Sequence, residues 1–281
     1  MSNASSGVNR IRFLERRLGS GANVHERITR LYLPIYEWCL ERVGKAGPVF
    51  IGINGPQGAG KSTLTRTLCE LFEHEGLRAV TVSVDDFYLT HEEQRRLAIE
   101  SSENPYLQSR GYPGTHDVEL GTQVLRELKG QDGTVLIPQY DKSQFAGKGD
   151  RLPRDLWRKV ELPLEIVFFE GWMLGFRARE ESVFTDPHLV DINRRLRAYE
   201  QWWAQLDALI QLKPKDYRFV IDWRVEAEER MKASGKPGLS EAEIRAYVTT
   251  FLPAYELYLP ELAAPAIEEL VVEIDLDRLP K

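Results

Sequence analysis

The sequence predicts a three-layer α/β fold, in which a mostly parallel sheet carries helices on both faces. Short apolar stretches alternate along the chain with longer segments whose apolar residues recur at helical spacing, which is typical of β-α-β units. The 281 residues, 42% hydrophobic and 28% charged, suit a globular protein with one large core. In such a sheet, ligands bind beyond the carboxyl ends of the strands, so the residues that follow each strand are the candidates for chemistry.

The N-terminal part of the chain is predicted to lie outside the sheet. Residues 1–23 lack the apolar core of a signal peptide and are expected to form a flexible tail. Their arginines and serines leave an organelle transit peptide as the alternative. Residues 24–43 are expected to form a helix despite Pro34, and residues 24–281 a single domain.

Strands and helices are expected to alternate over the rest of the chain. The expected strands are residues 49–54, 79–85, 134–138, 164–170, 207–212 and 269–275. The expected helices are residues 63–76, 117–129, 187–205, 216–233 and 240–251. A mobile hinge or loop is expected between the last two helices, at Gly235, Pro237 and Gly238.

A phosphate-binding loop follows the first expected strand. The stretch "GPQGAGKS" fits the pattern G-x-x-x-x-G-K-S/T, and a helical pattern follows it. In such a loop, backbone N–H groups and the helix N-terminus bind phosphates, the lysine reaches the β- and γ-phosphates, and the serine ligates Mg²⁺. The predicted nucleotide-binding residues are Gly55, Pro56, Gln57, Gly58, Ala59, Gly60, Lys61, Ser62 and Thr63.

Carboxylates stand at the ends of two further strands. Asp85 and Asp86 follow the second strand, where a carboxylate beside a γ-phosphate can take the proton of an attacking hydroxyl. We predict that Asp85 is this base and that Asp86 braces the loop, with turn capping as the alternative for such residues. Glu170 follows the apolar run "IVFF", where kinases usually carry Asp, and the longer side chain favours contact with a metal through water. Ser62 and Glu170 are therefore the predicted metal ligands.

Two loops between these strands predict a site for an acceptor molecule. They are residues 104–117 and 138–151, which mix glycine, proline, tyrosine, acids and cations, and plain surface loops are the alternative. Asp117 is the predicted partner of an acceptor hydroxyl. An anionic group of the acceptor has four candidate partners, which are Arg110, Lys142, Lys148 and Arg151. A stacking site for a nucleoside base stays open, formed by Tyr106, Tyr112 and Tyr140.

Residues 216–251 predict a small lid. A helix with Arg224, Arg230 and Lys232, followed by Lys236, would bring positive charge onto a transferring phosphoryl group and exclude water. Arg224 is the first candidate for this role. A salt-bridged exposed helix is the alternative, because the same segment contains Glu226, Glu228 and Glu229.

Taken together, the motifs resemble those of the D-glycerate 3-kinase family of P-loop kinases, and more distantly phosphoribulokinase, uridine kinase and bacterial pantothenate kinase. The resemblance extends from about Val24 to the C-terminus and is carried by the phosphate-binding loop with "DDFYLT", "RGYPGTHD", "PQYDKSQFAGKGDR", "FFEGWMLGF", "DWRVEAEERMKASGKPG" and "FLPAYELYLPEL". It implies a P-loop kinase fold and ATP-dependent, Mg²⁺-assisted phosphorylation of D-glycerate to 3-phosphoglycerate. It also implies Asp85 as base, Glu170 at the strand end, Arg224 in the lid and Asp117 in substrate binding.

Several functions stay open or are disfavoured at this point. A nucleoside, pantothenate or another sugar acid remains an alternative acceptor, whereas a GTPase-like switch is disfavoured because no N-K-x-D or D-x-x-G motif follows the loop.

The net charge of −6 argues against a nucleic-acid or membrane-surface binder. No run approaches the about 18 apolar residues of a membrane span. Cys39 and Cys69 are interpreted as buried reduced thiols, so a cytoplasmic location is expected.

Overall fold

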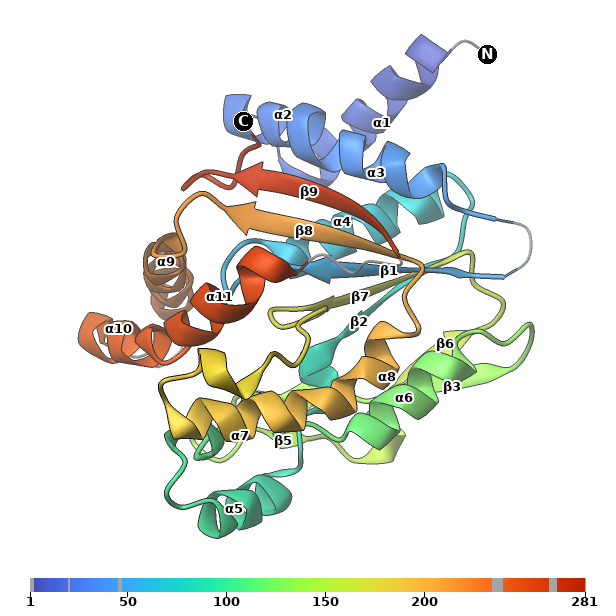
Figure 1. The fold of residues 1–281 in the computed structure, drawn as a ribbon. Helices are drawn as coiled ribbons and strands as arrows, with labels where there is room; N and C mark the ends of the chain where they lie inside the picture. The colour runs from blue at the N-terminus through green and yellow to red at the C-terminus, as the bar shows by residue number, and fades with distance from the viewer. Residues whose placement is uncertain (1–2, 20, 45–46, 234–239, 263–266, 281) are drawn as a thin grey trace.

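The computed structural model describes residues 3–19, 21–44, 47–233, 240–262 and 267–280. Its centre is a five-stranded sheet in the order β2-β7-β1-β8-β9, and each recorded pairing within it is parallel (Figure 1). The strands are β1 (Val49–Asn54), β2 (Ala79–Ser83), β7 (Ile166–Gly171), β8 (Ala208–Pro214) and β9 (Glu268–Ile274). The predicted parallel α/β class is confirmed.

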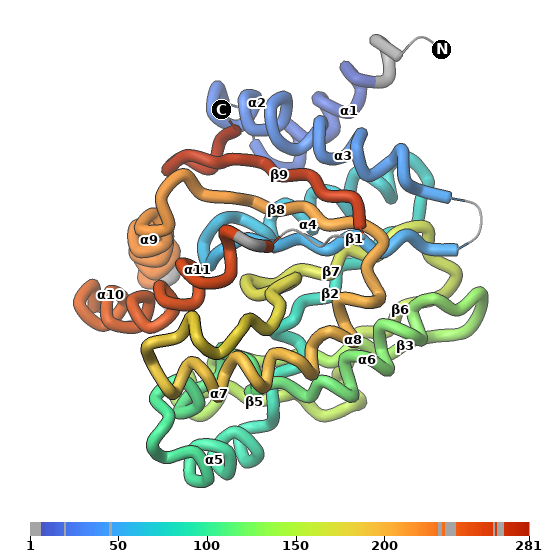
Figure 2. Tube along the Cα trace, in the orientation of Figure 1, coloured from blue at the N-terminus to red at the C-terminus, as the bar shows by residue number. Residues whose placement is uncertain are grey.

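Helices pack on both faces of this sheet, and the trace of the chain shows them above and below the strands (Figure 2). Neighbouring residues of a strand point to opposite faces. Accordingly, the ring of Phe168 lies 5.9 Å from that of Phe72, whereas the ring of Phe169 lies 5.6 Å from that of Trp202. The helices that precede β2 are α1 (Asn3–Leu18), α2 (Ala22–Arg27), α3 (Leu33–Leu40) and α4 (Lys61–His74). The others are α5 (His91–Glu100), α6 (Val118–Glu127), α7 (Pro187–Leu196), α8 (Glu200–Trp203), α9 (Phe219–Ala233), α10 (Glu241–Thr249) and α11 (Leu252–Tyr258).

Most expected elements are present, with shifted ends. The helix expected over residues 24–43 contains a π turn at Ile28–Tyr32 between α2 and α3, and Pro34 stands in the first turn of α3. The second strand ends at Ser83 because the Ser83 side chain caps a 3₁₀ turn over Val84–Phe87. Among the helices in the described ranges, none is long and apolar enough to cross a membrane.

The strand expected at residues 134–138 does not belong to the central sheet. β3 (Thr134–Ile137) pairs antiparallel with β6 (Arg158–Glu161), and β4 (Tyr140–Asp141) pairs antiparallel with β5 (Asp150–Arg151). The burial pattern gives the reason. β1 and β7 are buried at every residue, as parallel central strands require, whereas β3 has an exposed and partly exposed face.

The flexible tail predicted for residues 1–23 is instead helical over most of its length. Apolar residues Ile11, Leu14 and Leu18 recur on one face of α1, and Leu14 is 0% exposed. The ring of Phe13 stacks on His74 at the end of α4, with 4.1 Å between the centroids. The arginines that suggest a solvated tail instead form ion pairs with α4 and its C-terminal end, such as Arg17 with Glu70 at 3.1 Å.

Because Leu14 is fully buried, the Leu14→Ala variant is expected to lose about 2–5 kcal/mol of unfolding free energy, the usual range for a buried leucine. Val8 on the same helix is 49% exposed, so Val8→Ala serves as the control. Urea unfolding of both variants measures the difference. Equal, small losses would mean that α1 does not dock on α4 in solution.

Candidate active site

The phosphate-binding loop lies between β1 and α4, in the middle of the sheet. Gly58 and Gly60 have φ angles of 80° and 94°, in the left-handed region that favours glycine. A Cβ atom on Gly58 would lie 2.6 Å from the Cβ of Trp223, so a larger residue would clash there. The loop therefore needs glycine for its shape as well as for access of phosphate to the backbone.

Lys61 folds back over this loop. Its Nζ donates hydrogen bonds to the carbonyl oxygens of Gly55, at 2.7 Å, and of Pro56, at 3.1 Å. Burial lowers the pKa of Lys61 from its ordinary value, while the carboxylates of Glu170 and Asp85 act in the opposite direction. The ammonium thus lies between the loop and two carboxylates, where a phosphate oxygen can replace the carbonyl partners.

Ser62 and Glu170 meet at the same edge of the sheet. The Ser62 hydroxyl donates a hydrogen bond to Glu170 Oε1 at 2.8 Å, and Glu170 is 6% exposed. Hydroxyl and carboxylate oxygens are ligands that suit Mg²⁺. In the part of the chain that the structure describes, no group of three or more His, Cys, Asp or Glu side chains is arranged to hold a metal ion. The pair therefore fits a Mg²⁺ ion that takes its other ligands from water and phosphate.

Asp85 forms an ion pair with Lys142, whose Nζ lies 2.5 Å from Asp85 Oδ2. Burial acts to raise the pKa of Asp85, but the charge and hydrogen bond of the Lys142 ammonium outweigh it, helped by a hydrogen bond from Tyr88, and the pKa falls to about 2. Asp85 is thus ionised at neutral pH. Both residues line a cavity of about 500 Å³ that also contains Ser62, Tyr140 and Glu170.

Asp86 braces the loop after β2, as predicted. Its Oδ2 accepts a hydrogen bond from the Ser83 N–H at 3.0 Å, while the Ser83 hydroxyl accepts one from the Asp85 N–H. Burial raises the pKa of Asp86 to about 7. The two neighbouring aspartates therefore differ in charge state, because the Lys142 ammonium outweighs the burial of Asp85, whereas the Ser83 N–H and the Arg158 guanidinium do not outweigh the burial of Asp86.

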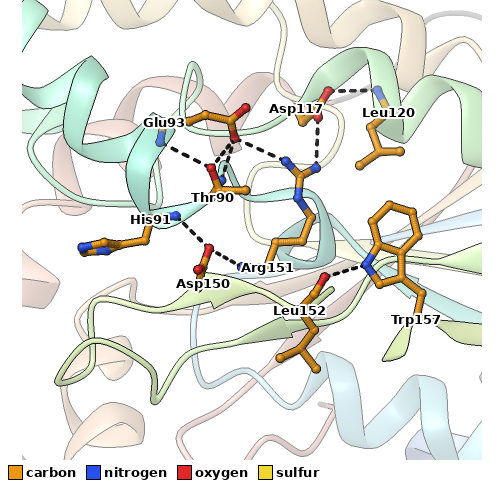
Figure 3. A network of polar contacts seen from close by, with 9 residues as sticks. All are labelled: Thr90, His91, Glu93, Asp117, Leu120, Asp150, Arg151, Leu152 and Trp157. Carbon is orange, nitrogen blue, oxygen red and sulfur yellow. Dashed lines mark hydrogen bonds and ion pairs between the residues drawn. The ribbon is translucent and has the colours of Figure 1, made fainter. Parts of the chain in front are cut away.

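The structure pairs two predicted substrate residues with each other (Figure 3). Asp117 Oδ2 accepts a hydrogen bond from Arg151 Nη1 at 3.0 Å, and Asp117 Oδ1 accepts one from the Leu120 N–H, which caps α6. Arg151 also reaches Glu93 at 3.3 Å, and its side chain is 9% exposed. The network ties β5 to the starts of α5 and α6, so the observed contacts of Asp117 and Arg151 are structural.

Arg110 and Tyr140 join the two acceptor loops. Arg110 Nη1 donates hydrogen bonds to the carbonyl oxygens of Gly147, at 2.9 Å, and Lys148, and its guanidinium lies 5.6 Å from the ring centroid of Tyr140. The other tyrosines considered for stacking on a base already have protein partners. The Tyr112 ring stacks on Phe251, and the Tyr106 hydroxyl donates to Asp186 at 2.7 Å.

The described part of the predicted lid consists of α9 and α10. Arg224 on α9 pairs with Glu228 on the same helix at 3.6 Å, and its guanidinium lies 6.0 Å from the ring of Tyr247 on α10. Its Nε is buried and has no hydrogen-bond partner among the described residues. The Arg230 side chain lies outside the described part of the structure, as do Gly235, Lys236, Pro237 and Gly238.

Sequence reasoning missed Arg278, which follows β9. Arg278 Nε donates to the Gly58 carbonyl oxygen at 2.7 Å, its Nη2 pairs with Glu226 of α9 at 2.6 Å, and its guanidinium lies 5.2 Å from the Trp223 ring. These residues line a cavity of about 260 Å³ beside the phosphate-binding loop, together with Tyr32. No motif near the C-terminus signals this arrangement, which depends on β9 running beside β8.

His116 was also missed as a neighbour of Asp85, although it stands within the block "RGYPGTHD". Its ring stacks on Tyr88 at 4.4 Å, and its Nδ1 lies 2.8 Å from the Tyr199 hydroxyl. Burial lowers the pKa of His116 to about 3, so the ring is neutral at physiological pH.

Comparisons with known proteins agree with this geometry. A model of the phosphoribulokinase / uridine kinase family matches residues 50–189, from β1 into α7. The solved D-glycerate 3-kinase from Cryptococcus neoformans superposes with a TM-score of 0.79 at 31% identity, covering 93% of this chain and 98% of that one. This chain belongs to the D-glycerate 3-kinase family of P-loop kinases. The family is one of ATP-dependent small-molecule kinases.

Two curated relatives extend the match. A chloroplastic D-glycerate 3-kinase of Arabidopsis thaliana is 37% identical over 90% of this chain, which spans 60% of the length of that relative. An uncharacterised kinase of Schizosaccharomyces pombe is 38% identical over 77% of this chain and 83% of its own. Family membership therefore rests on matches that include nearly all of one solved structure.

The raised pKa of Asp86 predicts a pH-dependent stability. Because its pKa is about 7 in the folded chain against an ordinary 3.8, this carboxyl stabilises the fold below about pH 4, and the contribution is lost as pH rises through 7. Asp86→Asn keeps an oxygen for the Ser83 N–H and removes the charge. The unfolding free energy of this variant is expected to rise relative to the unsubstituted protein between pH 4 and 8.

Urea unfolding at several pH values in Mg²⁺-free buffer measures this difference. Asp132→Asn is the control, because it removes an exposed carboxyl from the loop before β3. A difference between Asp86→Asn and the unsubstituted protein that stays constant with pH would contradict the buried, protonated state of Asp86.

Proposed function

We propose that this protein transfers the γ-phosphoryl group of ATP to a hydroxyl of D-glycerate, giving 3-phosphoglycerate and ADP. The observation that carries the proposal is the ionised Asp85 carboxylate, which shares one cavity with Ser62 and Glu170, next to the phosphate-binding loop. Two similar proteins named D-glycerate 3-kinase, at 37% and 31% identity, support glycerate as the acceptor.

In this proposal the nucleotide spans the loop. The backbone of residues 55–63 binds the phosphates, and Lys61 exchanges the carbonyl oxygens of Gly55 and Pro56 for β- and γ-phosphate oxygens. The cavity beside Trp223 and Arg278 takes the adenosine end, because residues 58–63 of the loop line it as well. Ser62 and Glu170 are the residues that would hold Mg²⁺. Bound Mg²⁺ supplies positive charge to the phosphate oxygens.

Asp85 orients the acceptor hydroxyl and takes its proton as the new P–O bond forms and the bond to the β-phosphate oxygen breaks. A carboxylate with a pKa of about 2 is a weak base. In a loose transition state for phosphoryl transfer, orientation and electrostatics contribute more than early proton removal, so a weak base suffices. Arg224 of α9 adds positive charge to the transferring group when the lid closes.

Two further observations support a reducing compartment and an acceptor other than a nucleoside. Cys39 and Cys69 are free thiols, which supports a reducing compartment such as the cytoplasm. Tyr106 and Tyr112 are engaged in protein contacts, which argues against a stacking site for a nucleoside base.

An assay of ADP release over a panel of acceptors tests this function. D-glycerate is expected to give the highest kcat/KM, with L-glycerate, uridine and pantothenate as poor acceptors, because a site built for hydrogen-bonding groups rejects analogues that leave them unpaired. Lys61→Ala, which removes the phosphate-binding ammonium, should abolish ADP release and controls for contaminating kinases. A higher kcat/KM with uridine or pantothenate would make the acceptor assignment wrong.

Replacement of the proposed base gives a second prediction. Asp85→Asn is expected to lower kcat by ~10²–10⁴, the usual effect of losing a general base, with a much smaller change in the KM for ATP. Glu73→Gln is the matched control, because Glu73 lines the same cavity but lies about 18 Å along α4 from Lys61. Loss of ATP binding with an unchanged kcat would make Asp85 a metal-site residue instead.

A further inference from the structure

A glycerate-like acceptor carries a carboxylate, and the acceptor loops offer several cations to bind it. Arg151 is an unsuitable partner, because its guanidinium already binds Asp117 and Glu93 and its side chain is 9% exposed. Freeing this guanidinium would leave the carboxylates of Asp117 and Glu93 without their ion-pair partner (Figure 3).

Arg110 also stabilises the protein, through contacts with the second acceptor loop. Its guanidinium holds the carbonyl oxygens of Gly147 and Lys148 and lies over the Tyr140 ring, so it maintains the shape of the loop on which Lys142 stands. An acceptor that bound Arg110 would have to break its hydrogen bonds to Gly147 and Lys148.

Lys142 differs from both arginines. Its side chain is 58% exposed and reaches the cavity that contains Asp85, Ser62 and Glu170. Among the described residues, Asp85 is the hydrogen-bond partner recorded for its ammonium. An ammonium has three N–H donors, so further donors stay available for a ligand while the bond to Asp85 is kept. The carboxylate of Asp85 raises the pKa of Lys142, which keeps the donor charged.

We propose that Lys142 binds the carboxylate of the acceptor while it remains bonded to Asp85, and so selects small hydroxy acids. This inference rests on the proposed function. One ammonium then holds the general base and the acceptor carboxylate side by side, and the reacting hydroxyl must lie within a few carbon atoms of that carboxylate. D-glycerate meets this condition, because its carboxylate and its terminal hydroxyl are at opposite ends of three carbons.

The same arrangement explains why other acceptors are rejected. Without Lys142, the charge of Asp85 would repel an incoming carboxylate. A nucleoside has no carboxylate to match the ammonium, and in pantothenate the carboxylate is far from the primary hydroxyl. Lys142 is therefore a specificity residue that acts on acceptor binding, whereas Asp85 acts on the reacting hydroxyl.

The test compares D-glycerate with D-glyceramide, in which an amide replaces the carboxylate, at saturating ATP. The unsubstituted protein is expected to prefer D-glycerate strongly. In Lys142→Met, the KM for D-glycerate should rise on the order of 10- to 100-fold, the usual loss of a charge-assisted hydrogen bond, with little change for D-glyceramide. Lys142→Arg should restore part of the preference. Lys148→Met is the matched control, because Lys148 is an exposed cation of the same loop that is not among the residues lining the cavity with Asp85.

Thermal unfolding confirms that each variant is folded before its kinetics are compared. A Lys142→Met variant that keeps the preference for D-glycerate would overturn the inference. So would a fall in kcat that is equal for both acceptors with unchanged KM values, because Lys142 would then serve Asp85 alone. An equal loss in Lys148→Met would assign the effect to the general charge of the loop and would also overturn it.

Failure of the proposed function gives a different result. If the unsubstituted protein releases no ADP with D-glycerate, the proposed function is wrong, and the carboxylate–amide comparison is repeated on the hydroxy acid that does release ADP. If no hydroxy acid does so, both proposals are wrong. Activity on D-glycerate with an unchanged preference in Lys142→Met rejects the role of Lys142 alone.

Discussion

The parallel register of three strands governs the chemistry of this protein. β7 lies between β1 and β2, and Glu170 pairs in register with Ile53 on one side and Ser83 on the other. Parallel strands end at the same edge of the sheet, so the phosphate-binding loop, Glu170 and the turn with Asp85 are brought together although they are far apart in sequence. The Ser62–Glu170 hydrogen bond, at 2.8 Å, joins the first turn of α4 to this edge.

Charge compensation decides what the residues at this edge can do. Asp85 has Lys142 beside it and is ionised, whereas the neighbouring Asp86 has its pKa raised to about 7 by burial. Lys61 lies near two carboxylates, and Arg151 neutralises Asp117 in a network that supports the loops. Arg151 thus has a structural role, whereas the exposed Lys142 lines the cavity and has N–H donors available for a ligand.

Periodicity and motifs predicted the fold class and several elements well. β1 has the bounds that the apolar run indicates, and α4 follows the phosphate-binding loop as its helical pattern predicts. The predictions failed where tertiary contacts replace local signals. α1 is a docked helix because its apolar face, with Leu14, packs on the core, and its arginines, which suggest a solvated tail, pair with residues of α4 instead. β3 pairs with β6 outside the central sheet, which a short apolar run alone does not reveal.

The sequence by itself determined the phosphate-binding loop and the carboxylates at the strand ends, because each is a local pattern of a few residues whose backbone geometry follows from residue type. The tertiary structure decided which side chains pair. Lys142 and Asp85 are 57 positions apart, Arg151 and Asp117 are 34 apart, and Arg278 and Gly58 are 220 apart. Such contacts depend on the order of strands in the sheet and on packing between loops, so no local spacing encodes them. For this reason four cations were equal candidates in the sequence. The folded chain distinguishes Lys142 from the two arginines by their contacts, and from Lys148 because Lys142 lines the cavity with Asp85 and Lys148 does not.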